Sequence, residues 1–412
     1  MSIIKPFRGL RPIEKQAENI ASPPYDVINS EEARQACRDN PYSFLRIVKP
    51  EVDLDADIDL YDPRVYQQGA ENMAAFRQEG YLVQDDSPCF YVYKQKMGDH
   101  VQVGLVACAS CADYERDIIK KHEKTREDKE LDRTRHILAL NANTGPVFLT
   151  FRHDDQVDAL LTRAMERTPA YDFTSPDGVQ HTFFVVPDRE WIAAIRRRFQ
   201  DINPLYVADG HHRSASATRV MREKKAENPG HRGNEEYNFF LTVIFPDNQM
   251  NIMAYNRVVR DLAGLQPDAF LKRLEDAFTV TPSTDKEPVE KHSYCMYIGG
   301  RWYTLKAKPG SFDAQDPVDR LDASILQNNL LAPVLDIHNP RTDERIDFVG
   351  GIRGVKELER LVDSGNFTVA FSLYPTSVKE LIEVADAGRL MPPKSTWFEP
   401  KLRSGMIVHL LD

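Results

Sequence analysis

The sequence predicts an α/β (α+β) fold, and three observations support this class. Helical and strand-type apolar patterns alternate along the chain instead of forming separate blocks. The strand-type runs are short and almost wholly apolar, which is typical of strands buried within a sheet. The chain has 412 residues, more than the ~100–200 of a usual domain, so it should hold two domains or one large domain with insertions.

Three segments place apolar residues at the helical spacing of three and four. Gly80 provides a stop for the first of them. Ser377 and Glu380 form a capping box at the start of the last, and Gly388 ends it. We therefore expect helices over residues 66–76, 157–165 and 378–385.

Between the helical patterns lie short apolar runs rich in aromatic and β-branched residues, which predict strands over residues 90–93, 205–208, 237–245, 294–298 and 368–373. The boundary between domains is weakly marked, because no Gly/Ser linker, low-complexity segment or internal repeat is present. We place it so that residues 1–258 form the first region and residues 259–412 form a C-terminal α+β region.

Composition and charge exclude several classes of protein. The net charge of −10 argues against binding of nucleic acid, which needs a basic face to neutralise phosphates. The apolar, low-charge stretch at residues 103–112 is far shorter than the ~20 residues that span a bilayer. The first ten residues carry charges and a proline where a signal peptide needs an apolar run. We therefore expect a cytoplasmic protein that contacts neither nucleic acid nor membrane.

The five cysteines are few, odd in number and unevenly spread, which fits a reducing compartment better than a disulfide framework. Cys108 and Cys111 have the spacing of a redox or zinc pair. They lie in a run that predicts a buried strand, and no second pair completes a zinc site, so we expect structural thiols.

The segment Asp209–Ala217 has the properties of an anion site. A short strand runs into Asp209 and Gly210, two histidines and an arginine follow, and a helix is predicted from Ser214 to Lys225. Glycine permits a tight turn, and the first N–H groups of a helix attract negative charge. We expect Arg213 to bind phosphate from an exposed helix start, where its substitution leaves the fold intact.

His211, His212 and Ser214 complete this turn as candidate donors to the same anion. A metal site is an open alternative, with Asp209 and the two histidines as ligands of zinc or manganese. No helical motif of metal-binding histidines accompanies them.

Two further segments hold candidate catalytic residues. His122, Glu123 and Arg126 precede a helix-like charged run, and Glu123 is a candidate general base while Arg126 is a candidate phosphate clamp. A solvated helix face explains the run equally well.

Pro23 and Pro24 fix an extended loop that presents Tyr25 and Asp26, or that serves only as a connector.

Six motifs stand at residues 22–28, 122–125, 141–146, 209–214, 255–259 and 391–400. Together they resemble the family called domain of unknown function 1015, and the resemblance covers nearly the whole chain. Members of that family resemble neighbours of serine-biosynthesis enzymes in bacterial genomes, which indicates a metabolic context and no mechanism.

Asp209–Ala217 is also similar to the phosphate-binding turn of the ParB/sulfiredoxin fold, a superfamily that includes free-serine kinases. Residues 1–25 resemble the N-terminal strand and Pro–Tyr loop of that fold. About 180 residues separate Tyr25 from Asp209, so the resemblance implies a nucleotide-binding core with large insertions. The catalytic cysteine of sulfiredoxin is replaced by His211, which makes reduction of sulfinic acid improbable.

The resemblance implies a nucleotide-dependent phosphotransferase that acts on a small hydroxyl metabolite, with free serine as the best candidate. Asp209–Ser214 and Arg126 would hold ATP or ADP, Asp209 would bind Mg²⁺, and Glu123, His122 and Asp26 would act in catalysis. A nucleotide-binding regulator without activity and a metal-dependent hydrolase using Asp209, His211 and His212 remain alternatives.

Overall fold

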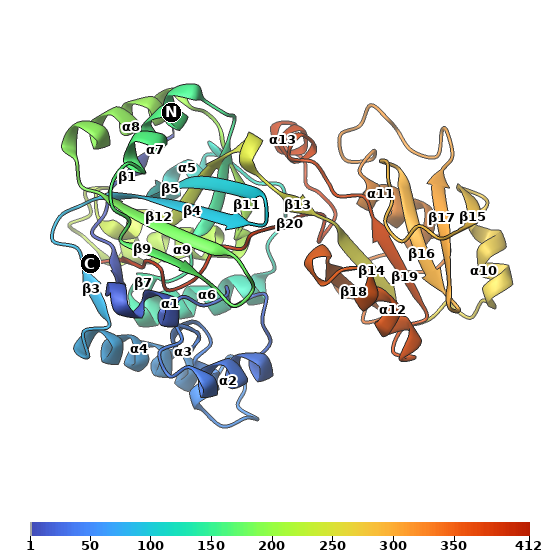
Figure 1. Ribbon diagram of the computed structural model, residues 1–412, viewed down its shortest axis with the longest axis horizontal. Helices are drawn as coiled ribbons and strands as arrows, with labels where there is room; N and C mark the ends of the chain where they lie inside the picture. The colour runs from blue at the N-terminus through green and yellow to red at the C-terminus, as the bar shows by residue number, and fades with distance from the viewer. Residues whose placement is uncertain (1) are drawn as a thin grey trace. The chain divides into compact units, whose positions relative to one another are not determined.

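A computed structural model describes residues 2–412, and contacts divide the chain into two compact units (Figure 1). Unit 1 comprises the described residues up to Lys121, with Thr125–Met250 and Pro400–Asp412; unit 2 comprises His122–Lys124 and Asn251–Glu399. The division therefore lies ahead of the 258/259 boundary that the sequence suggested. The final segment, assigned by sequence to the C-terminal region, belongs to unit 1.

Within the described residues, unit 1 is built on a mixed sheet of nine strands, in the order β6-β11-β8-β12-β5-β4-β10-β9 with β1 paired to β5. The pairs β6–β11 and β8–β12 are parallel and the others are antiparallel. The strands are β1 (Ile4–Lys5), β4 (Phe90–Met97), β5 (His100–Ser110), β6 (Ile119–Lys120), β8 (Val147–Phe151), β9 (Tyr171–Thr174), β10 (Gln180–Val186), β11 (Leu205–Asp209) and β12 (Phe239–Pro246).

Helices pack on this sheet through alternate residues of its strands. Leu105 and Ala107 of β5 and Ile244 of β12 share one core with Val157 and Phe199 from two of the helices. Burial of these side chains is the main stabilising contribution to unit 1. The helices of unit 1 are α1 (Ala17–Ile20), α2 (Ser30–Asp39), α3 (Leu45–Val48), α4 (Pro63–Gln78), α5 (Cys111–Glu115), α6 (Glu127–Leu140), α7 (Asp155–Ala164), α8 (Arg189–Asp201) and α9 (His211–Glu227).

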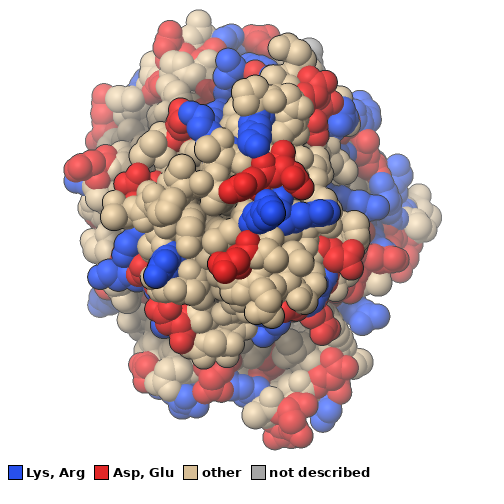
Figure 2. Space-filling model, turned by 90° about the vertical axis from the view of Figure 1, so that its right-hand side faces the viewer, with Lys and Arg blue, Asp and Glu red and all other residues tan. Residues whose placement is uncertain are grey.

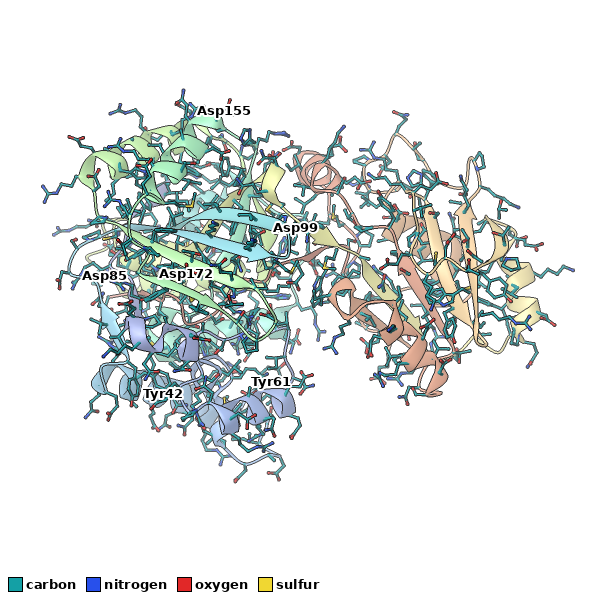
Figure 3. All side chains as sticks on the ribbon, viewed as in Figure 1. Tyr42, Tyr61, Asp85, Asp99, Asp155 and Asp172 are labelled. Carbon is teal, nitrogen blue, oxygen red and sulfur yellow. The ribbon has the colours of Figure 1, made fainter. Side chains whose placement is uncertain are left out.

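The N-terminal segment is anchored to an aromatic cluster on β4 and β10. The rings of Tyr91 and Phe183 stack with centroids 5.5 Å apart. The Tyr91 hydroxyl donates to Asp85 Oδ2 at 2.7 Å and accepts from the N–H of Gly9 at 2.9 Å. Arg11 also pairs with Asp85, at 2.8 Å; Asp85 is labelled in Figure 3. Strand β2 (Leu10–Pro12), which pairs with β3 (Leu82–Gln84), is thereby tied to the main sheet.

The last thirteen residues are held to unit 1 by main-chain hydrogen bonds. Ser22 and Ser404 exchange two of them, at 3.0 and 2.9 Å. Strand β21 (His409–Leu410) pairs antiparallel with β7 (Ala142–Asn143). These contacts place the C-terminal segment beside two of the segments that the sequence singled out, the Pro–Tyr loop and the turn that begins at Asn141.

Unit 2 contains, as described, a six-stranded antiparallel sheet in the order β15-β17-β16-β19-β14-β18 and a separate pair of strands, β13 and β20. Its strands are β13 (Ile252–Met253), β14 (Tyr255–Val259), β15 (Phe278–Ser283), β16 (Ser293–Ile298), β17 (Arg301–Ala307), β18 (Ile346–Gly350), β19 (Val369–Leu373) and β20 (Trp397–Phe398).

Both faces of this second sheet are covered by helices. Tyr294 and Met296 of β16 face a core shared with α10 (Pro267–Leu274) and α11 (Asp322–Leu326). The alternate residues Cys295 and Tyr297 face a second core that includes Leu358 of α12 (Val355–Asp363). A fourth helix, α13 (Val378–Asp386), completes the unit, and its capping box is formed as predicted.

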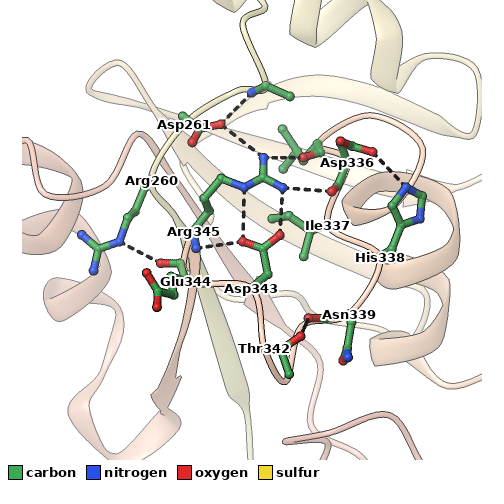
Figure 4. A network of polar contacts seen from close by, with 12 residues as sticks. Arg260, Asp261, Asp336, Ile337, His338, Asn339, Thr342, Asp343, Glu344 and Arg345 are labelled. Carbon is green, nitrogen blue, oxygen red and sulfur yellow. Dashed lines mark hydrogen bonds and ion pairs between the residues drawn. The ribbon is translucent and has the colours of Figure 1, made fainter.

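The loop before β18 is organised by the guanidinium group of Arg345 (Figure 4). It binds Asp343 through two hydrogen bonds, at 3.2 and 2.8 Å, and lies 3.5 Å from Asp261. It also donates to the carbonyls of Leu335 and Asp336, at 3.0 and 2.9 Å. Because every strong contact of this arginine is internal, we assign the network to the folding of unit 2.

Two features concern the possible partners of the protein: the charge on its surface and the length and apolar character of its helices. Among the described residues on the face drawn in Figure 2, acidic and basic side chains are interleaved and no broad patch of one sign is visible. Across residues 2–412, no helix combines the length and apolar character needed to cross a bilayer.

The predicted α/β class is confirmed, and so are the predicted helices and strands, except that the strand predicted from residue 237 begins at Phe239. The helix after Gly210 is longer than predicted, because it begins at His211 and includes the residues that we expected in a loop. Cys108 and Cys111 are fully buried, and burial raises the pKa of both thiols.

The packing of β5 against β12 leaves no room for a side chain at Gly104. A Cβ there would lie 2.6 Å from Val243 Cγ1 and 2.8 Å from the ring of Phe245. Gly104→Ala should lower the free energy of unfolding by about 1–3 kcal/mol. Gly230→Ala is the control, because the nearest atom to its Cβ is 3.4 Å away. Equal urea midpoints for the two variants would contradict this packing.

Candidate functional site

The candidate site begins at the turn between β11 and α9. Gly210 caps the helix with φ of 95°, a left-handed conformation that favours glycine. A Cβ at this position would also lie 3.1 Å from Nε and Cζ of Arg213. Glycine is therefore required both by the turn and by the arginine that passes over it. The turn directs the first N–H groups of a 17-residue helix outward from its start, as an anion site needs.

Arg213 lies inside the protein instead of at an exposed helix start, so that expectation was wrong. Its side chain is only 10% exposed, and its Nη2 lies 3.6 Å from a carboxylate oxygen of Asp26 and 3.6 Å from one of Asp209. Its Nη1 donates to the carbonyl of Pro146. Within residues 2–412, its buried Nε has no hydrogen-bond partner. A buried donor without an acceptor is costly, which indicates a place for a ligand atom.

The carboxylate of Asp209 uses both of its oxygens within the site. Oδ1 accepts from the N–H of Gly210 at 2.9 Å, and Oδ2 lies 3.2 Å from Nζ of Lys401. Burial alone would raise the pKa of Asp209, but the cations of Lys401 and Arg213 outweigh it and lower that pKa. Asp209 is therefore ionised at neutral pH, and in this arrangement it holds cations of the protein.

The other residues of the turn have different surroundings. His212 Nε2 accepts a hydrogen bond from the N–H of Arg126 at 3.1 Å. His211 is 5% exposed, and it contributes to the lowering of the pKa of Asp209. Ser214 is fully buried, and its hydroxyl donates to the carbonyls of Gly210 and His211. The Ser214 hydroxyl thus stabilises the helix start, whereas we expected it to donate to an anion.

The Pro–Tyr loop lies against this turn, although about 180 residues separate Tyr25 from Asp209 in the chain. Asp26 reaches Arg213, as described, and its side chain is 37% exposed. Tyr25 lies under the guanidinium of Arg133, with Cζ 4.3 Å from the ring centroid. The structure therefore joins two segments that the sequence could only propose as parts of one site.

A small pocket with a cavity volume of about 30 Å³ lies beside Arg213 and Tyr25. Three motifs meet there: the Pro–Tyr loop, the turn after Asn141 and the start of α9. Arginines are the only ionised side chains in its lining, and most of the remaining wall is apolar. The lining residues are Pro24, Tyr25, Val48, Arg133, His136, Ile137, Asn143, Thr144, Gly145, Val147, Arg213, Ala217, Phe240, Leu241 and Ser404.

His136 is an uncharged polar group in the wall of this pocket. Its Nε2 is 2.8 Å from the carbonyl of Ile47, so Nε2 carries the proton and Nδ1 is an acceptor. Burial and the neighbouring Arg133 lower the pKa of His136 to about 3. Sequence analysis missed His136 because a single histidine within a charged helical run gives no signal of its own.

Two predicted catalytic residues belong to the other unit. His122–Lys124 group with unit 2 by their contacts, and the carbonyl of His122 accepts from the N–H of Met391 at 2.8 Å. The roles of His122 and Glu123 therefore remain predictions. Arg126 is in unit 1, but its guanidinium is 54% exposed and bound to Asp128. Its backbone N–H contacts the turn by donating to His212.

The comparison with protein families gives a direct result. The model described as "Protein of unknown function (DUF1015)" matches residues 4–324. The chain belongs to this family. The match covers the motifs around Asp26, Glu123 and Asp209, and it ends before the last motif at residues 391–400. A comparison with curated proteins finds no match.

The solved structures that resemble this DUF1015 protein share little sequence identity with it. A free serine kinase in complex with AMP is 11% identical, with a TM-score of 0.34, over 68% of this chain and 84% of that chain. SbnI with a C-terminal truncation, from Staphylococcus aureus, is 12% identical, with a TM-score of 0.39, over 73% and 85%. A conserved hypothetical protein from Pyrococcus furiosus is 13% identical, with a TM-score of 0.35, over 70% and 90%. These likenesses carry no functional argument.

The buried histidine of the pocket predicts a pH dependence of stability. Because the pKa of His136 is lowered on folding, the unfolded chain binds one more proton between about pH 6.5 and pH 3, and the folded state loses stability across that range. His136→Gln keeps a donor for Ile47 and cannot titrate there. Its urea midpoint should fall less than that of the wild type between pH 7 and pH 4. If the urea midpoints of the variant and the wild type fall equally between pH 7 and pH 4, His136 is not held neutral in the folded protein.

Proposed function

We propose that this DUF1015 protein is a nucleotide-dependent phosphotransferase whose acceptor is a small hydroxyl metabolite, with free serine as the best candidate. The observation that carries the proposal is Arg213, a buried arginine with an unpartnered Nε–H in the wall of a pocket. It lies at the start of a helix whose first N–H groups favour an anion. The likeness of residues 209–217 to the phosphate-binding turn of the ParB/sulfiredoxin fold supports the same reading.

Phosphoryl transfer suits such a site because it depends on positioning and charge neutralisation more than on covalent chemistry by the protein. The bond from the transferred phosphorus to the nucleotide oxygen breaks, and a bond to the substrate hydroxyl forms. The hydroxyl proton passes to a carboxylate, a role that we assign to Glu123. The Gly210–Arg213 turn would hold the phosphates of ATP or ADP.

Mg²⁺, when bound, would neutralise phosphate charge in the transfer step. Asp26 fits this ion better than Asp209, although both lie 3.6 Å from Arg213, because the side chain of Asp26 is 37% exposed and that of Asp209 is 29% exposed. Both oxygens of Asp209 are engaged by Gly210 and Lys401. Carboxylate oxygens of this kind are the ligands that Mg²⁺ prefers alongside phosphate and water.

A nucleotide-binding regulator without activity is the second candidate. It is favoured by one observation, that Asp26 and Asp209 at the turn both pair with Arg213 and so do not act as free bases. Serine-dependent turnover of ATP or ADP separates the two candidates. The hydrolase alternative gains no support from the geometry, since no three metal-ligating groups converge anywhere in the described chain and His212 Nε2 accepts from Arg126.

Arg213→Lys keeps the positive charge between Asp26 and Asp209 and removes the planar donor fork. It should weaken binding of ATP and ADP by about 1.5–3 kcal/mol, the range for a hydrogen bond to a charged group. Arg219→Lys on the same helix is the matched control, since Arg219 is more exposed and pairs with Glu223. Calorimetric titration measures both variants. Unchanged affinity in Arg213→Lys would remove the arginine from the nucleotide site.

Glu123→Gln tests the assigned base. It should reduce serine-dependent turnover by ~10²–10⁴-fold and leave nucleotide affinity nearly unchanged, because a carboxylate that accepts the hydroxyl proton acts in the transfer step. Glu127→Gln, four residues later and exposed, should retain full turnover. Single-turnover assays beside nucleotide titrations measure both quantities. If Glu123→Gln turns over like the wild type, another residue accepts the proton.

A further inference from the structure

The C-terminal segment brings a cation to the turn that begins α9. After unit 2 the chain returns to unit 1 at Pro400, and the next residue, Lys401, places Nζ 3.2 Å from Asp209 Oδ2. The side chain of Lys401 is only 15% exposed. Asp209 Oδ2 also lies 3.6 Å from Nη2 of Arg213, so Lys401 and Arg213 share one carboxylate oxygen.

The chain at Lys401 and just after it is held by contacts within unit 1. Its own carbonyl accepts from Nε2 of Gln95 at 2.9 Å. Two residues later, Arg403 donates to Ser175 Oγ at 2.9 Å and pairs with Asp177. A side chain on a backbone held in this way is positioned before any ligand arrives, which lowers the entropic cost of binding.

The charges at the turn show why this cation matters. Arg213 lies in the first turn of α9, yet its guanidinium is 3.6 Å from the carboxylates of both Asp26 and Asp209. Without Lys401 the group would carry one net negative charge, and a polyphosphate would be repelled. With Lys401 the two cations balance the two carboxylates, and the helix start adds partial positive charge.

We infer that Lys401 is a second phosphate-binding cation of the site, and that Asp209 is a positioning residue that holds Lys401 and Arg213 beside the turn. This inference rests on the proposed function. An ammonium group is a compact charge with rotatable donors, so it can share its contacts between Asp209 and a phosphate oxygen. The chain after unit 2 is then part of the nucleotide site.

The experiment titrates the full-length wild type, Lys401→Gln and Lys401→Arg with ADP and with inorganic pyrophosphate, at two salt concentrations. Lys401→Gln should bind both ligands at least tenfold more weakly and with a smaller dependence on salt, because one cation is lost. Lys401→Arg keeps the charge and should recover most of the affinity. Lys225→Gln, an exposed lysine near the end of α9, should behave like the wild type.

Each other outcome overturns the inference in a distinguishable way. If Lys401→Gln has a lower thermal midpoint but binds pyrophosphate like the wild type, Lys401 serves only to hold Asp209. If Lys401→Gln does not fold, Lys401→Arg decides: loss of pyrophosphate binding in this folded, charge-retaining variant contradicts the inference. If the wild type binds neither ADP nor pyrophosphate, the proposed function and the inference fail together.

Discussion

The carboxylate of Asp209 is the contact on which the candidate site depends. It joins the end of β11 to the N–H of Gly210, to the guanidinium of Arg213 and to the ammonium of Lys401. These groups come from the turn itself and from a segment that follows unit 2. Because the two cations lower the pKa of Asp209 against the effect of burial, the carboxylate stays charged at neutral pH, and the arrangement persists.

This arrangement places charges in advance of any ligand. Two carboxylates and two cations meet at the start of α9, and removal of any one leaves a partly buried charge without compensation. Arg213 retains one buried donor that the protein does not satisfy. The network is balanced in charge but lacks one hydrogen-bond acceptor. We expect it to bind a ligand oxygen, because that oxygen would accept from Nε of Arg213 while the carboxylates stay in place.

Local patterns predicted the elements well, and long-range contacts explain what they missed. The capping box of α13 and the apolar run of β12 depend on neighbours in sequence, so both were predictable. The burial of Arg213 depends on Asp26, far away in the chain, and the helical residues His211–Arg213 were expected in a loop. Lys401 was missed because its partner is 192 residues away.

Three motifs that meet at one pocket indicate a binding site, whereas no single one of these segments does. The Pro–Tyr loop, the turn after Asn141 and the start of α9 each had a plausible structural explanation when considered alone. Their side chains meet around one pocket, in which arginines provide the only charge and His136 is held neutral. An apolar wall with cationic anchors strengthens the attraction for an anionic group, because little water is present to screen it. The site is therefore better suited to a phosphate or carboxylate than to a cationic ligand.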